Sequence, residues 1–337
     1  MAKQTLNYSQ VLTALQQKQY APVYLLMGEE AFYIDLIADY IQNNVLDEPE
    51  REFNLTVLYG KDTDIATVIN AAKRYPMMAN HQIVIVKEAQ NIKVWDDLTY
   101  YLQKPLMSTI LVLCYKYGTP DKRKKWIQEI DKTGIMFESP KLRDYEMAAW
   151  IGQYAKSKNM SLDAKAVVML AEFLGTDLSK VANELDKLAI TVPAGTTITP
   201  ELIEKNIGIS KDYNVFELQA AFINRDVLKA NRIVRYFAEN KKNNPLVVVF
   251  GQLFNFFGNL MLYHYLPDKS QMTVANELKI NPFFVKDYAK AAQSFNAWKT
   301  MNIISFIREA DARSKGVQNT GTNEEDLMKE LVYKILH

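Results

Sequence analysis

The first 140 residues alternate between short strand patterns and amphipathic helix patterns, and this alternation constrains the fold more than any other feature. Apolar runs that predict strands, many of them β-branched, stand at residues 23–27, 56–59, 82–86, 109–114 and 136–139. Helical periodicity lies between them, as over residues 31–45, 65–73 and 95–103. Strands that alternate with helices are typical of a mostly parallel sheet with helices on both faces. We therefore expect residues 1–140 to form one α/β domain.

The remaining residues predict helices alone. After Pro140 we expect three short helices, at residues 145–158, 163–174 and 178–190, and a fourth that begins at Thr199-Pro200-Glu201. Helical patterns then continue to the end of the chain. We predict a small helical domain over 141–210, a linker near 199–213, and an all-helical domain over 211–337.

Composition sets broad limits on function. A length of 337 residues, with 48% hydrophobic and 23% charged residues, suits a globular protein of two or three domains. The formal net charge of +1 gives no general argument for nucleic acid or membrane, although residues 211–337 hold 17 Lys+Arg against 13 Asp+Glu. The one cysteine, Cys114, excludes an internal disulfide, and the N-terminus lacks the apolar stretch of a signal peptide. A cytoplasmic location is expected.

The first strand pattern leads into Gly28-Glu29-Glu30 and then into a helix, which is where a nucleotide-binding α/β domain places its phosphate loop. That loop needs a second glycine and a lysine, and neither is present here. Carboxylates at a helix N-terminus suit the helix dipole but repel a phosphate. We interpret Glu29 and Glu30 as caps of the helix that mark a lost nucleotide site, in preference to a metal or acid/base pair.

Catalysis has little support. The three histidines lie in separate segments, and the sequence has neither a Cys/His cluster for zinc nor a nucleophile elbow. We predict no catalytic site, no metal and no cofactor. The basic cluster Lys122, Arg123, Lys124 and Lys125 is a candidate for phosphate contacts, although a solvated charge run is the commoner reason for such a pattern.

Two apolar segments have alternative interpretations. Tyr75-Pro76-Met77-Met78 joins a helix to a strand, and its residues alone favour core packing over a protein-binding surface. Residues 246–266 lack any Asp, Glu, Lys or Arg and are long enough to span a membrane. Gln252, Asn255 and Asn259 recur there at helical spacing, so a buried or subunit-packing helix is favoured over a membrane span.

In combination these segments resemble the delta-subunit family of bacterial DNA polymerase III clamp loaders. The resemblance covers essentially the whole chain and rests on the order and spacing of segments 23–30, 75–79, 82–86, 121–125, 178–188, 215–218 and 281–286. It implies an AAA+-like α/β domain without a working phosphate loop, a small helical lid domain and a helical collar domain. The family's role is in DNA replication, as part of a DNA-directed DNA polymerase holoenzyme, which is a nucleotidyltransferase.

The resemblance also changes the interpretation of the two methionines. Family members open the beta sliding clamp with an apolar pair that follows a helix of the first domain, and the matching position is Met77-Met78, with Tyr75 beside it. The family commonly has a leucine and an aromatic residue there. The implied partners are the clamp, the gamma/tau and delta-prime subunits through the collar, and primed DNA. A diverged AAA+ ATPase and a membrane-associated scaffold that uses residues 246–266 remain the alternatives.

Overall fold

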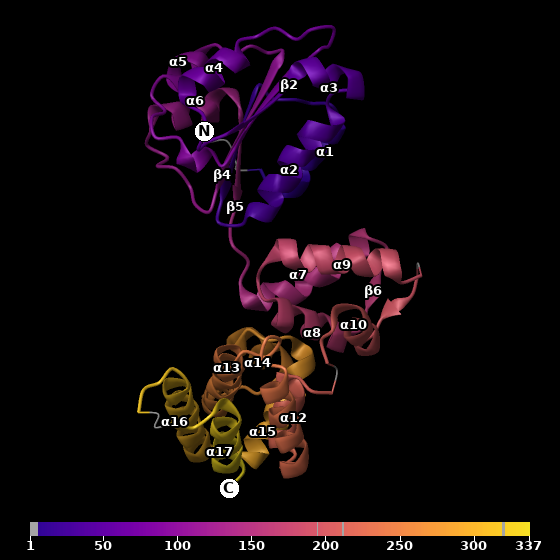
Figure 1. Cartoon of the computed structure of the whole chain (residues 1–337), viewed down its shortest axis with the longest axis vertical. Coiled ribbons are helices and arrows are strands. Elements are labelled where there is room, and N and C mark those ends of the chain that lie inside the picture. The colour runs from indigo at the N-terminus through magenta and orange to yellow at the C-terminus, as the bar shows by residue number, and fades with distance from the viewer. Residues whose placement is uncertain (1–5, 194, 211, 319–320) are drawn as a thin grey trace. The chain divides into compact units, whose positions relative to one another are not determined.

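The computed structural model describes residues 6–193, 195–210, 212–318 and 321–337 (Figure 1). Residues 1–5 of the N-terminus and Lys211 of the expected linker lie outside the described residues. The chain divides into two compact units, Met1–Leu142 and Arg143–His337.

The first unit contains a five-stranded, all-parallel sheet. Its strands are β1 Val23–Gly28, β2 Leu55–Tyr59, β3 Gln82–Lys87, β4 Thr109–Lys116 and β5 Ile135–Ser139. They lie in the order β2-β3-β4-β1-β5, so that β1 is paired on both sides. The predicted fold class, a parallel α/β sheet followed by helices, is confirmed.

Helices cover both faces of this sheet (Figure 1). Side chains of β1 alternate between the faces: Leu25 packs with residues of α4 Ile65–Ala72, α5 Leu98–Gln103 and α6 Lys125–Thr133. Leu26 points the other way and packs with residues of α1 Tyr8–Gln16 and α2 Ala31–Asn44. Burial on both faces explains why the strands read as continuous apolar runs. The single cysteine, Cys114, is buried in the second of these clusters.

Several details of this unit differ from the sequence prediction: the helix expected over 95–103 begins at Leu98, and α1 was not predicted. The helix expected to reach residue 73, with Pro76 as its stop, ends at Ala72 with Lys73 as its C-cap. A short helix that the pattern did not predict, α3 Glu48–Asn54, precedes β2. It begins with a capping box between Asp47 and Glu50, which is a sequence signature of a helix start.

The second unit begins with the helices α7 Asp144–Ser157, α8 Ala164–Leu174, α9 Leu178–Thr191 and α10 Pro200–Ile207. The expectation that strands cease after Pro140 is wrong, because Ser161–Leu162 (β6) and Thr197–Ile198 (β7) form a short parallel pair. Two-residue strands have too few residues to show the period-2 pattern by which strands are recognised.

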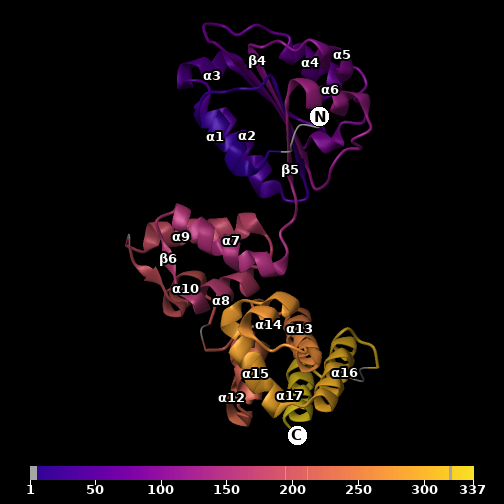
Figure 2. The same ribbon diagram turned by 180° about the vertical axis from the view of Figure 1, so that it is seen from behind.

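The rest of the unit is helical, as predicted. It comprises α11 Val215–Ile223, α12 Val227–Glu239, α13 Leu246–Tyr265, α14 Gln271–Leu278, a short 3₁₀ turn at Pro282–Phe284, α15 Val285–Ser294, α16 Ala297–Ser314 and α17 Glu324–Leu336 (Figure 2). These helices share one hydrophobic core.

Within the described residues, α13 is the one helix long and apolar enough to cross a membrane. Its buried face belongs to the core and carries Val249, Phe250, Leu253, Phe256, Phe257, Leu260 and Tyr263. Core packing therefore accounts for much of its apolar character. Another face remains exposed, with Val247, Phe254, Leu262 and Tyr265 between 47% and 74% accessible.

Candidate functional sites at the two edges of the sheet

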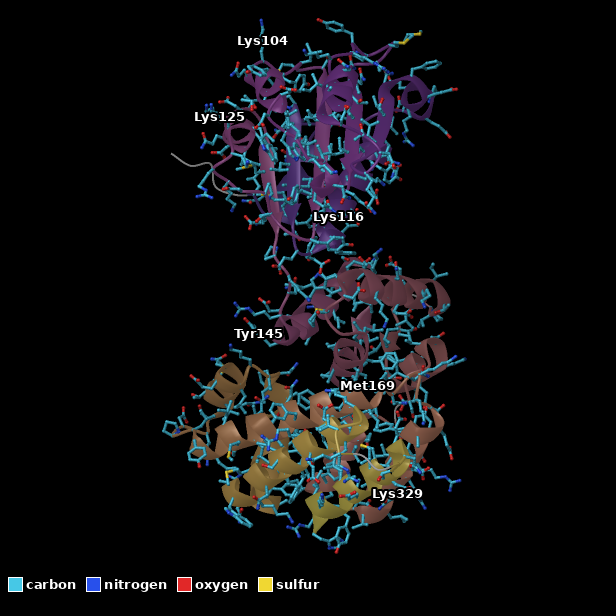
Figure 3. The ribbon with its side chains drawn as sticks, turned by 60° about the vertical axis from the view of Figure 1, so that its left-hand side comes forward. Lys104, Lys116, Lys125, Tyr145, Met169 and Lys329 are labelled. Carbon is cyan, nitrogen blue, oxygen red and sulfur yellow. The ribbon has the colours of Figure 1, made fainter. Side chains whose placement is uncertain are left out.

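A parallel sheet has two different edges, because all strands begin at one and end at the other. Figure 3 shows this for β4: Lys104 lies in the connection that leads into the strand, and Lys116 is its last residue. We call these the amino edge and the carboxyl edge. Gly28, Glu29 and Glu30 lie at the carboxyl edge, and Tyr75, Met77 and Met78 lie at the amino edge.

At the carboxyl edge, Gly28 is held tightly by its neighbours. Its N–H donates to the carbonyl of Gly118 (2.9 Å), and the N–H of Gly118 donates back (3.1 Å). The φ angle of Gly28 is +138°, and a Cβ at this position would lie 2.1 Å from the carbonyl oxygen of Ser139. Only glycine fits here, because β5 passes directly against the end of β1.

The residues that follow Gly28 form the start of α2 and satisfy its first backbone groups. The buried Glu30 is the N-cap of α2, and its Oε1 accepts a hydrogen bond from the N–H of Phe32 (2.9 Å). The N–H of Glu30 itself donates to the carbonyl of Ser139 (3.2 Å). Glu29 is exposed, so the structure assigns the cap to Glu30 alone. Two backbone N–H groups at the start of this helix, where a phosphate loop would bind its ligand, are thus bonded within the protein.

A lysine that the sequence reasoning did not single out also lies at this edge. Lys116 pairs in register with Gly28 across β4 and β1, and its Nζ lies 2.6 Å from Oδ1 of Asp35 in α2. Burial alone would lower the pKa of Lys116, but the hydrogen bond and charge of Asp35 outweigh it and raise that pKa. The cation is therefore already neutralised inside the protein.

The basic cluster follows β4 at the same edge, and half of its charge is paired. Arg123 binds the carboxylate of Asp121 (Nη2–Oδ2 2.8 Å), and Lys122 Nζ lies 2.7 Å from Oε2 of Glu138. The hydrogen bonds from the side chain and backbone of Arg123 lower the pKa of Asp121 to about 2. Lys124 and Lys125 are exposed at the start of α6. The structure thus leaves fewer cations for phosphate contacts than the sequence suggests.

At the amino edge the connection between α4 and β3 presents apolar side chains to solvent. Tyr75 is 75% exposed, Met77 61% and Met78 99%. Core packing, which the residue pattern alone favoured for this segment, is therefore wrong for these three side chains. Met78 has a positive φ of 55°, which is uncommon for a residue with a side chain.

This connection is tied down at both ends. The carbonyls of Ala71 and Ala72, at the end of α4, accept hydrogen bonds from Gln82 Nε2 (2.9 Å) and Thr109 Oγ1 (2.9 Å). Further along, the amide of Asn54 binds the backbone of Met77. The exposed Met77 side chain is therefore carried by a residue whose own backbone N–H and carbonyl are both hydrogen-bonded.

Two more exposed apolar side chains lie at this edge. Phe53, 66% exposed, precedes the Asn54 that binds Met77, and Met107, 70% exposed, precedes the Ser108 whose carbonyl accepts from Gln82 N–H (2.8 Å). Sequence reasoning missed both residues. Exposed apolar side chains that gather in one place mark interaction sites more often than scattered ones do.

Comparisons with known proteins agree with this architecture. The family model for the DNA polymerase III delta subunit matches residues 24–139, and the model for the C-terminal domain of the same family matches residues 212–334. A model described as a middle domain matches residues 143–205.

Individual relatives cover nearly the whole chain. This chain is 26% identical over 333 residues to DNA polymerase III subunit delta of Bacillus subtilis (strain 168). The aligned region covers 95% of this chain and 94% of that protein. The solved structure of the Bacillus subtilis DNA clamp loader delta protein matches with a TM-score of 0.55 and 24% identity, covering 98% of this chain and 99% of that one. The fold is that of a clamp-loader protein. The chain belongs to the DNA polymerase III delta subunit family.

Proposed function

We propose that this delta subunit binds and opens the beta sliding clamp during DNA replication, without ATP hydrolysis of its own. One observation carries the proposal: Met77 and Met78, at the position that matches the family's clamp-binding pair, project into solvent from a well-bonded connection. Methionine is unbranched and polarisable, so it adapts to the shape of an apolar pocket. Tyr75 extends the same surface.

The energetics suit such a contact. Burial of two methionine side chains is worth roughly 3–6 kcal/mol before ordering costs. A ligand shifts an equilibrium only by its differential affinity for the two states. The delta chain therefore opens the clamp because it binds the open form more tightly than the closed one.

In this proposal the partner subunits bind and hydrolyse ATP, and this chain does neither. Gly28 and Glu30 bond their own N–H groups to Gly118 and Ser139, and Glu30 occupies the helix N-terminus, which argues against a nucleotide at this edge. We assign residues 1–140 to clamp binding, 141–210 to a lid domain and 211–337 to a collar that packs against gamma/tau and delta-prime. The exposed apolar face of α13 is the surface we propose for that packing. Lys124 and Lys125 are the candidates for contacts with primed DNA.

The test is binding of the purified chain to the sliding clamp of the same organism, without nucleotide, beside a Met77→Ser/Met78→Ser variant. Submicromolar binding that the variant weakens about 100-fold or more supports both the function and the contact. If the variant binds the clamp as tightly as wild type, the function stands and the contact lies at other residues. Failure of the wild-type chain to bind at tens of micromolar clamp contradicts the proposal.

The alternatives predict different results. A diverged ATPase requires the isolated chain to bind ATP, which we expect to be undetectable by calorimetry at millimolar nucleotide. A membrane scaffold requires α13 to partition into liposomes, which we expect not to happen because the buried face of that helix belongs to the core.

A further inference from the structure

We propose that Asn54 is a positioning residue that holds Met77 and Met78 in the conformation the clamp recognises. This inference rests on the proposed clamp contact. Asn54 is the last residue of α3 and lies 23 positions before Met77 in the chain. Only 1% of its surface is exposed, while its neighbour Phe53 is 66% exposed.

The amide of Asn54 makes a three-point connection. Its Oδ1 accepts from the N–H of Met77 (2.6 Å), and its Nδ2 donates to the carbonyl of Met77 (2.9 Å) and to the carbonyl of Glu50 (2.9 Å). Both backbone groups of Met77 are thereby bound to a single side chain, as they would be to a neighbouring strand. The bond to Glu50 fixes the amide on its own helix.

The chemistry of this contact requires an amide. A carboxylate of the same shape has no hydrogen to donate, so it would face the carbonyls of Met77 and Glu50 with acceptors only. A buried polar group left without its partner is costly. An apolar side chain would leave both backbone groups of Met77 to water, and the connection would lose its anchor.

The anchor determines where the methionines point. Pro76 precedes Met77 with a ring-restricted φ angle, and Met78 follows with a φ of 55°. Ala79 then packs against the core cluster of the sheet. Met78 therefore lies at a bend between the bonded Met77 and the partly buried Ala79, and its side chain is 99% exposed.

Pre-organisation of this kind lowers the cost of binding, because the connection is already ordered before the partner arrives. If only a fraction of molecules holds the competent conformation, the apparent affinity falls by that fraction. Loss of the Asn54 anchor should therefore slow association with the clamp and leave dissociation of the formed complex nearly unchanged.

The test compares Asn54→Asp with Asn44→Asp in clamp-binding kinetics. Asn44 is the control for this change at a helix end, because it is also the last residue of its helix and also donates to the carbonyl four residues earlier, that of Tyr40 (3.0 Å), but it is exposed and has no bond to Met77. We expect association to slow about tenfold for Asn54→Asp and to stay within about twofold of wild type for Asn44→Asp. In the Met77→Ser/Met78→Ser background, Asn54→Asp should have no further effect.

Hydrogen exchange adds a second measurement. The Met77 amide should be protected in the wild-type chain and should lose that protection in Asn54→Asp, while amides of β1 remain protected and show that the unit is folded. Wild-type binding with an unchanged association rate in Asn54→Asp, or an unprotected Met77 amide in wild type, overturns the inference and leaves the proposed function standing. Absence of wild-type binding overturns the proposed function itself, and with it the role of Asn54 in clamp recognition.

Discussion

The two edges of one sheet differ in which of their groups are bonded within the protein and which are exposed. In open α/β sheets ligands generally bind at the carboxyl edge. Here that edge is filled by the protein's own groups: Glu30 caps α2, Gly118 pairs with Gly28, and Asp35 neutralises Lys116. The amino edge, which usually has no ligand, instead exposes Met77 and Met78.

The two edges differ in the kind of group that remains available to a partner. At the carboxyl edge, the backbone N–H groups of Gly28, Glu30 and Phe32 are bonded to neighbours in the chain. At the amino edge the backbone polar groups of Met77 are satisfied and the apolar side chains are not buried. The first arrangement favours a closed structural edge, and the second favours burial of apolar area against another protein.

The largest change in the free energy of unfolding is expected at Gly28, where neighbouring backbone leaves no room for a side chain. Gly28→Ala should destabilise the first unit by about 3 kcal/mol or more, because its Cβ meets the backbone of Ser139 and its φ is unfavourable for alanine. Gly118→Ala is the control, since a Cβ there meets no atom within 4 Å and the cost should stay below about 1 kcal/mol. Urea unfolding measures both. Equal costs would show that this edge is not closed by packing.

A smaller effect is expected from the surroundings of the methionine pair. Phe53→Ser/Met107→Ser should weaken clamp binding by about 1–2 kcal/mol, or about tenfold, if these side chains extend the same contact. Tyr117→Ser is the control, because Tyr117 is 75% exposed and follows β4 at the opposite edge. Equilibrium titration with the clamp measures both variants. A Tyr117 variant that binds as weakly as the double variant would erase the distinction between the edges.

The smallest effect concerns Lys116 and Asp35. Asp35→Asn should cost about 0.5–1 kcal/mol at pH 7, because the carboxylate is 42% exposed and its attraction to Lys116 is partly screened by solvent. The pKa of Lys116 is raised in the folded state, so the pair stabilises fully below the unfolded pKa of about 10.4. This stability is lost as pH rises through the raised folded value.

Urea unfolding of wild type and Asp35→Asn across this pH range tests that assignment. The difference between the two proteins should be constant from neutral pH to about pH 10 and shrink above it. A difference that instead grew with pH would mean that Asp35 acts through some other partner. In Asp35→Asn the Glu30 side chain still accepts a hydrogen bond from the N–H of Phe32. We therefore expect this variant not to bind ATP.

Much of the first unit could be predicted from its residues, because strands buried on both faces appear in the sequence as unbroken apolar runs. Each strand ends close to the end of its run. The five strands agree with their predicted ranges to within two residues at either end. The α3 helix was missed although its capping box is visible at Asp47 and Glu50. The pairing of Lys122 with Glu138 was not predictable, because no local pattern relates residues 16 positions apart.

The sequence by itself determined the α/β class, the helical second half and the absence of a phosphate loop, because each depends on local periodicity or on residue types within one turn. Only the tertiary structure decided that Met77 and Met78 are exposed rather than buried. The connection that carries them is bonded by Asn54, Gln82 and Thr109, whose hydrogen bonds join residues 11 to 37 positions apart in the chain. An apolar pair has the same local pattern in a core and on a surface, so its burial depends on which segments the tertiary fold brings around it.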